Sequence, residues 1–194
     1  MKLAITGHSG GLGLAIATKF ENEGHEVVGF SLDNGYDITD RLNREQIMLR
    51  SMSSDVFVNC AHSRATNCMS QTHMFNEIYK AWQKEDRHII NIGSIVTDWM
   101  VGPYRPGRAM YRSAKAALEA TTLEASGLRN PCHVTTLKPD WIESDELTMI
   151  EEEAGKKAPY VLKPSDVADL VYYIVTMRPI MTITSVTLRG PRVA

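Results

Sequence analysis

The chain has 194 residues, of which 43% are hydrophobic and 23% charged, and its formal net charge is −2. This length suits one domain over residues 1–194, and the near-neutral charge argues against nucleic acid or an anionic membrane as a partner. No apolar run reaches the roughly 18 residues of a membrane span, and the chain starts directly in a strand-like segment, so we expect a cytoplasmic protein without a signal peptide.

The N-terminal stretch predicts a strand, a tight turn and a helix. An apolar run of strand length meets a glycine-rich turn at residues 7–13, and an alanine-rich amphipathic helix then continues to Gly24. Such glycines let the chain reverse, let backbone approach a ligand and let the helix pack on the strand, while the helix N-terminus faces the turn. A pyrophosphate suits this turn, although Ile16 replaces the third glycine of the plain G-x-G-x-x-G form. The alternative is a glycine-rich turn that binds nothing.

Strands and helices alternate along the rest of the chain. We expect strands at residues 26–30, 55–59, 88–92, 132–137 and 182–188, and helices at residues 41–51, 69–84, 109–126 and 166–177. Thr39 or Asp40 can cap the helix that begins at Arg41. The alternation and the crossover lengths predict an open, doubly wound α/β sheet that is parallel. In such sheets ligands bind beyond the carboxyl ends of the strands, where the strand order reverses.

One helix carries a pair of residues with the chemistry of a proton-transfer centre. Tyr111 and Lys115 are four residues apart, so their side chains lie on one helix face. A phenol has a reference pKa of about 10, and a nearby ammonium lowers it toward neutral pH. Ser94, at the end of the preceding strand, can hold a substrate oxygen against the phenol. Alone, the Y-x-x-x-K spacing is also typical of a surface tyrosine beside a solvated lysine.

The ordered set of motifs resembles the short-chain dehydrogenase/reductase family over nearly the whole chain. The motifs are the glycine turn after Thr6, Asn59-Cys60-Ala61 after a strand, Ser94 after the next strand, and Tyr111 with Lys115 at the start of a helix. The resemblance implies a Rossmann-type fold with helices on both faces of the sheet, and an NAD(P)-dependent oxidoreductase. It implies hydride transfer between nicotinamide and a carbonyl or alcohol, with Ser94, Tyr111 and Lys115 as catalytic residues.

The resemblance also implies which residues bind the cofactor. Asp37 matches the family's contact to the adenine amino group, Asn59 and Ala61 match the segment beside the adenine ribose, and Lys115 also reaches the nicotinamide ribose. The full set expected at the cofactor is Gly7, His8, Ser9, Gly11, Leu12, Gly13, Ser31, Asp37, Ile38, Asn59, Ala61, Tyr111, Lys115, Pro139, Ile142 and Ser144.

A fourth catalytic residue of the family is an asparagine about 28 residues before the serine. Asn67 lies 27 residues before Ser94 and Asn76 only 18, so we prefer Asn67, which would support a water relay. A simple helix cap is the alternative role for Asn67.

The chain departs from the family pattern around the substrate pocket. His62 and Cys60 stand where the family usually has a glycine and an asparagine, and the segment between Ala61 and Asn67 is shorter than usual. The pocket is therefore open or completed by a subunit partner.

The odd number of cysteines and their spacing indicate neither a disulfide framework nor a zinc site, and we predict no metal.

The loop before Tyr111 is longer than usual and includes Trp99. We expect it to be either a substrate wall or an exposed turn, with Arg105 and Arg108 either binding an acidic substrate or serving as surface charges. Residues 145–157 suit a mobile helical lid or a plain surface helix.

After the strand at residues 132–137, Asp140 stands where the family usually has the glycine of a Pro-Gly pair. A carboxylate is unusual near a bound phosphate. Either the side chain of Asp140 points away, or the backbone differs from that of the family.

The choice of nucleotide depends on the end of the second strand. An acidic residue there favours NAD, whereas Ser31 and His8 can donate to the 2′-phosphate of NADP, so we expect NADP(H) over NAD(H). Asp33 argues the other way.

By resemblance we also expect a homodimer or homotetramer, formed through the apolar face of the helix that carries Tyr111. The alternative function is a non-catalytic NAD(P)-binding sensor or interaction module, favoured by Asp140 and by the short segment after Ala61.

Overall fold

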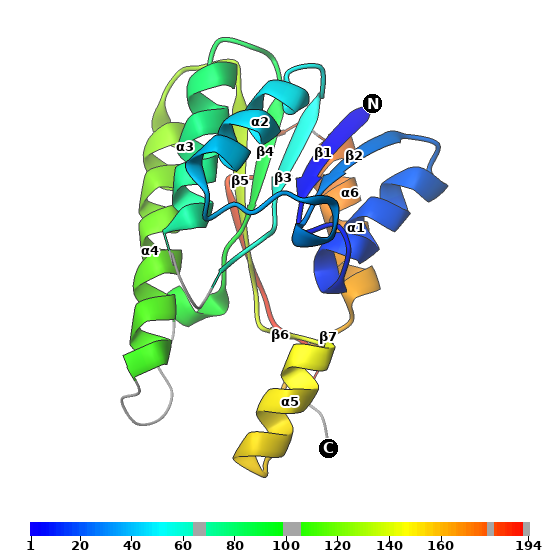
Figure 1. Cartoon of the computed structure of the whole chain (residues 1–194), viewed down its shortest axis with the longest axis vertical. Coiled ribbons are helices and arrows are strands. Elements are labelled where there is room, and N and C mark those ends of the chain that lie inside the picture. The colour runs from blue at the N-terminus through cyan, green and yellow to red at the C-terminus, as the bar shows by residue number, and fades with distance from the viewer. Residues whose placement is uncertain (64–68, 99–105, 178–180, 192–194) are drawn as a thin grey trace.

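The computed structural model describes residues 1–63, 69–98, 106–177 and 181–191. A parallel sheet forms its centre, with helices on both faces (Figure 1). Its strands are β1 (Lys2–Thr6), β2 (Glu26–Phe30), β3 (Val56–Asn59), β4 (His88–Ile92), β5 (His133–Pro139) and β8 (Ser185–Leu188). The expected strands therefore all form, each within a few residues of its predicted bounds.

The helices also follow the prediction closely. They are α1 (Gly11–Asn22), α2 (Arg41–Ser51), α3 (Ser70–Trp82), α4 (Pro106–Gly127), α5 (Asp145–Ala154) and α6 (Pro164–Met177), with short 3-10 helices η1 (Leu32–Asn34) and η2 (Ile95–Thr97). Asp40 caps α2, because its carboxylate accepts a hydrogen bond of 2.8 Å from the backbone N–H of Asn43. Among the described residues, no helix combines the length and apolar character that crossing a membrane requires.

The strand order is β2-β1-β3-β4-β5-β8, and every neighbouring pair is parallel. The order reverses between β1 and β3, so the fold is doubly wound, as predicted. Two segments meet at this reversal: the turn after β1 and the segment after β3. Both lie at the carboxyl edge of the sheet, where such folds place their ligands.

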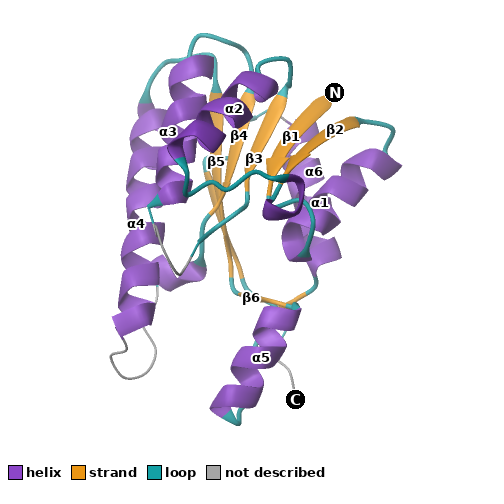
Figure 2. Ribbon diagram, in the orientation of Figure 1, coloured by secondary structure: helices purple, strands orange, loops and turns teal. Residues whose placement is uncertain are grey.

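Alternate residues of the strands build a separate core on each face. Leu3, Ile5, Val56 and Val58 pack against α1 and α6, whereas Ala4, Phe57 and Ile89 pack against α2, α3 and α4. Strands buried on both faces explain why the sequence shows continuous apolar runs instead of an alternating pattern. Figure 2 shows the two helical layers on either side of the sheet.

One small element was not predicted. β6 (Trp141–Ile142) pairs in parallel with β7 (Val161–Leu162), and α5 projects beyond the carboxyl edge of the main sheet from this pair (Figure 1). Two-residue strands are too short to show a periodicity, so the sequence alone did not indicate them. The expected lid segment does contain a helix.

Candidate functional site

The turn after β1 has the geometry that its glycines predict. Gly7 and Gly11 adopt positive φ angles of 76° and 50°, which a side chain would strain. A Cβ atom on Gly13 would overlap the Gly7 carbonyl, so the first turn of α1 packs on the strand end only because Gly13 has no side chain. The N-cap of α1 is Gly10, which provides no side-chain cap. The N-terminus of α1 therefore suits a phosphate group.

The segment after β3 lies directly against this turn. Thr6 Oγ1 accepts hydrogen bonds of 3.1 Å from the backbone N–H groups of both Cys60 and Ala61. A Cβ atom on Gly7 would lie 3.2 Å from the Ala61 backbone. The backbone of Ala61 thus borders the turn, and its expected place beside the adenine ribose stays a prediction. Asn59 is fully buried and its side chain points toward α3 and β4, so its amide is not presented to a ligand.

Other predicted cofactor residues surround the turn at different depths. Ser9 and Gly11 are exposed, His8 is half-buried, and Leu12 is buried against α1's core, so Leu12 can offer a ligand only its backbone. The ring of His8 packs over Gly29 of β2, where any side chain would collide with it.

The end of β2 places Ser31 at the start of η1. Ser31 is 7% exposed, and its backbone N–H donates a hydrogen bond of 2.8 Å to Asn34 Oδ1. The Asn34 side chain in turn donates to the Gly29 carbonyl at 2.9 Å. Asp33 lies on the exposed side of η1. No acidic side chain therefore stands at the Ser31 position itself.

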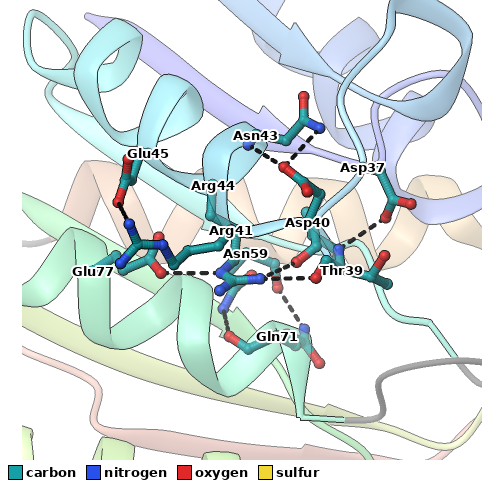
Figure 3. A network of polar contacts seen from close by, with 11 residues as sticks. Asp37, Thr39, Asp40, Arg41, Asn43, Arg44, Glu45, Asn59, Gln71 and Glu77 are labelled. Carbon is teal, nitrogen blue, oxygen red and sulfur yellow. Dashed lines mark hydrogen bonds and ion pairs between the residues drawn. The ribbon is translucent and has the colours of Figure 1, made fainter.

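The turn that carries Asp37 and Ile38 is held by a buried arginine that the sequence did not reveal. Asp37 Oδ1 accepts a hydrogen bond of 2.8 Å from the backbone N–H of Thr39. Arg44 Nη1 donates to the carbonyls of Ile38 and Thr39, at 2.9 and 3.1 Å, and Nε pairs with Glu77 at 3.0 Å (Figure 3). Arg44 thus ties the predicted adenine-side turn to α3.

Lys115 is nearly buried beside Tyr111. It is 3% exposed, and its Nζ atom donates hydrogen bonds to Gln71 Oε1 at 2.7 Å and to the Ile92 carbonyl at 2.8 Å. The same Nζ atom lies 5.7 Å from the centre of the Tyr111 ring. The ammonium therefore lies beside the aromatic ring of Tyr111.

Ser94 follows β4 and begins η2. Its Oγ atom accepts a hydrogen bond of 3.3 Å from the backbone N–H of Val96. The carbonyl of Ile92, two residues earlier in the chain, contacts Lys115. The fold thus brings the segment that carries Ser94 to the helix that carries Tyr111 and Lys115.

Gln71 is the residue of this region that sequence reasoning missed. Its side chain joins Lys115 to the ends of β3 and β4, and Figure 3 shows it beside Asn59. The only available signal was its place near the start of the helix between those strands, since glutamine by itself predicts no role. Asn67, the residue preferred in the sequence, lies outside the described residues, as do Trp99 and Arg105.

His62 also contacts the proposed centre. Its ring lies edge-on to the Tyr111 ring, with 5.0 Å between the centroids. The histidine that replaces the family glycine at position 62 therefore contacts the Tyr111 ring. Burial raises the pKa of the neighbouring Cys60 thiol to about 11, although the charge of Lys115 opposes this shift. Cys60 is therefore a neutral thiol near pH 7.

The Asp140 carboxylate has two partners close by in the structure. Its Oδ1 atom accepts a hydrogen bond of 2.9 Å from the backbone N–H of Trp141, and its Oδ2 atom lies 3.4 Å from Arg189 Nε. The carboxylate thus bonds the backbone of the next residue and pairs with Arg189, which follows β8. Pro139 is buried at the end of β5, Ile142 lies in β6, and Ser144 caps α5 by accepting from Leu147 N at 3.1 Å.

Comparisons with known proteins agree with this geometry. No family model matches the chain. It is 25% identical over 240 aligned positions to the NADP-dependent 3-hydroxy acid dehydrogenase YdfG of Salmonella typhi, with 97% of this chain and 94% of that protein covered.

Solved structures share the fold at lower identity. The NADH complex of 3-alpha-hydroxysteroid dehydrogenase from Pseudomonas sp. B-0831 has a TM-score of 0.75 at 16% identity, with 97% of this chain and 95% of that chain covered. A glucose/ribitol dehydrogenase from Brucella melitensis has a TM-score of 0.77 at 19% identity, with 96% and 94% covered.

Proposed function

Since the chain belongs to the short-chain dehydrogenase/reductase family and is an NAD(P)-dependent oxidoreductase, we propose that it transfers hydride between NADP(H) and the carbonyl or alcohol carbon of a small molecule, using Ser94, Tyr111 and Lys115. The observation that carries the proposal is the buried Lys115 ammonium, 5.7 Å from the centre of the Tyr111 ring.

Each member of the centre has a separate task in this proposal. Ser94 hydrogen-bonds the substrate oxygen, Tyr111 gives or takes the proton on that oxygen, and Lys115 keeps the phenol acidic enough to do so. Lys115 would also bond the nicotinamide ribose, and Asn67 would support a water relay. When bound, the cofactor supplies or accepts the hydride itself.

The glycine turn would hold the pyrophosphate of such a cofactor at the N-terminus of α1, where Gly10 and Gly11 have no atom within 4 Å of an added Cβ. Gly7, Ser9, Gly11 and the backbone of Leu12 and Gly13 would border the phosphates. The other residues that would border the cofactor are His8, Ser31, Asp37, Ile38, Asn59 by its backbone, Ala61, Pro139, Ile142 and Ser144.

Three observations support NADP(H) over NAD(H). The position after β2 is Ser31 and not an acid, His8 packs on the adjacent Gly29, and the relative from Salmonella typhi is named as NADP-dependent. That relative's name also makes 3-hydroxy acids the first substrates to test.

We further propose that residues 1–194 form one domain and that the chain forms a homodimer or homotetramer through α4, on which Met110 and Leu123 are exposed. The alternative function is a binding module without turnover, for which Asp140, paired here with Arg189, and the short segment after Ala61 are the arguments.

The first experiment is a fluorescence titration of the protein with NADPH and NADH, followed by turnover assays with 3-hydroxy acids, other alcohols and their carbonyl counterparts. Tyr111→Phe should abolish turnover and leave the cofactor Kd nearly unchanged. Arg129→Lys, an exposed change two residues beyond the C-terminal end of α4, serves as the control. Turnover retained by Tyr111→Phe would refute the catalytic assignment, and binding of neither nucleotide would refute the cofactor assignment.

A further inference from the structure

We propose that Gln71 is a positioning residue that holds the Lys115 ammonium beside Tyr111 and so controls the protonation of the phenol. This inference rests on the proposed function, because it gives Gln71 a task only if Tyr111 and Lys115 act as a pair. The inference is based on the hydrogen bonds that the Gln71 side chain makes to Lys115 and to the ends of β3 and β4.

The first argument is the environment of the lysine. Lys115 is 3% exposed, and burying an ammonium is costly unless hydrogen bonds replace its water. Gln71 Oε1 at 2.7 Å and the Ile92 carbonyl at 2.8 Å provide such bonds. Both acceptors are neutral, so they hold the ammonium without cancelling its charge. The charge therefore still acts on Tyr111, whose ring centre is 5.7 Å away.

The second argument is that Gln71 is itself fixed. Its Nε2 atom donates to the carbonyls of Asn59 and Ile92, at 2.8 and 3.0 Å, and the side chain is almost fully buried. Because both of these partners are acceptors, the amide nitrogen must face them, and the amide oxygen must then face Lys115. The orientation of the amide is thus determined by its surroundings.

The third argument is that Asn59, whose carbonyl accepts from Gln71 Nε2, is itself fixed by hydrogen bonds. Asn59 Nδ2 donates to the Gln71 backbone carbonyl at 2.9 Å and to Asn91 Oδ1 at 2.8 Å, and Asn91 donates to Thr122 on α4 at 3.0 Å. The network therefore joins β3, β4, α3 and α4 around the lysine. Buried hydrogen-bond networks of this kind restrict their side chains to few arrangements.

Glutamine satisfies this position where similar residues do not. Glutamate would turn a carboxylate oxygen toward the Asn59 and Ile92 carbonyls in place of the Nε2 donor, and its charge would oppose that of Lys115. Asparagine is one methylene shorter and cannot keep both its carbonyl partners and the contact to Nζ. Methionine has a similar volume and length but no strong acceptor or donor.

The test follows the ionisation of Tyr111 directly and needs no substrate. The ultraviolet absorbance of each protein is titrated with base, and the curve of the same protein carrying Tyr111→Phe is subtracted, so that only Tyr111 contributes. In the otherwise unchanged protein we expect a midpoint below the ordinary tyrosine pKa of about 10. Gln71→Met and Gln71→Glu should each raise this midpoint by at least half a pH unit. Gln83→Met, at the far end of the same helix, is the matched control and should leave it unchanged.

Circular dichroism and NADPH titration identify the variants that keep the native fold, and Gln71→Asn, the most conservative change, is titrated in parallel. A Tyr111 midpoint near 10 in the unmodified protein would refute the proposed Tyr111–Lys115 pair. A low midpoint that stays unchanged in the folded Gln71 variants would overturn the role of Gln71 alone. If only Gln71→Asn folds, its midpoint decides the question in the same way.

Discussion

Lys138 Nζ lies 2.6 Å from Asp98 Oδ1, and this ion pair joins the end of β5 to the segment that follows Ser94. Lys138 also bonds Glu119 on α4 at 2.8 Å, and Thr187 of β8 donates to the other oxygen of Asp98 at 2.8 Å. The stem of Lys138 passes under Gly93, where an added Cβ would lie 3.3 Å from Cγ. One lysine therefore connects the loop of the proposed catalytic serine with the helix of the proposed catalytic tyrosine.

Replacing Lys138 by Met should lower the free energy of unfolding by about 2–3 kcal/mol, because it leaves the carboxylates of Asp98 and Glu119 without their partner in a partly buried site. Urea unfolding at pH 7 measures the change. Lys157→Met, which removes an exposed ion pair with Glu151, should leave the urea midpoint nearly unchanged. Equal effects of the two substitutions would contradict the special position of Lys138.

The same pair predicts a pH dependence of stability. Burial opposes ionisation of Asp98, but hydrogen bonds from Lys138 and Thr187 outweigh it and lower the pKa of Asp98. A carboxyl with a lowered folded pKa stabilises the protein above its unfolded value of about 4, and this contribution is lost as the pH falls through the folded pKa. Burial likewise opposes the charge of Lys138, but Asp98 and Glu119 raise its pKa, so its contribution is present below about pH 10 and is lost above.

Thermal unfolding of the unchanged protein and of Asp98→Asn from pH 3 to pH 7 tests the acid side. The difference in Tm should be largest near pH 7 and should shrink as the pH falls below about 4, because Asp98 then takes up a proton when the protein unfolds. A difference that is constant across this range would show that ionisation of Asp98 does not contribute.

Gly13→Ala should disrupt the turn after β1, because the new methyl group would overlap the Gly7 carbonyl. We expect a loss of about 1–3 kcal/mol of stability from overpacking, and at least a tenfold weaker NADPH affinity. Fluorescence titration and urea unfolding measure the two effects. Gly10→Ala is the matched control, since its Cβ would meet no atom within 4 Å and its φ of −158° suits any residue. Comparable losses in the two variants would mean that the packing of Gly13 on Gly7 is not what matters.

Ser31→Asp should change the nucleotide preference. A carboxylate at the end of β2 repels a 2′-phosphate and accepts from ribose hydroxyls, so NADPH affinity should fall at least tenfold while NADH affinity is kept or improved. Asp33→Asn, on the exposed side of η1, should not reverse the preference. Titrations with both nucleotides check this prediction, and an unchanged NADPH affinity in Ser31→Asp would place the 2′-phosphate elsewhere.

Much of the fold was predictable from residues close together in the chain. The apolar runs indicated each strand of the main sheet, and the helical periodicity indicated α1 and α6 nearly to their ends. The paired strands β6 and β7 escaped prediction because strands of two residues carry no pattern and depend on a partner far along the chain. The catalytic roles of Ser94, Tyr111 and Lys115 were inferred from the order and spacing of their motifs, and they remain predictions.

By itself, the sequence determined the alternation of strands and helices and the glycine turn, because periodicity and glycine stereochemistry are local properties. Only the tertiary structure decided the partners of the charged groups. Gln71 and Lys115 are 44 residues apart, and Asp98 and Lys138 are 40 apart. Such pairs form because parallel strands bring their carboxyl ends to one edge of the sheet, and the resulting burial then requires each charge to have a hydrogen-bond partner.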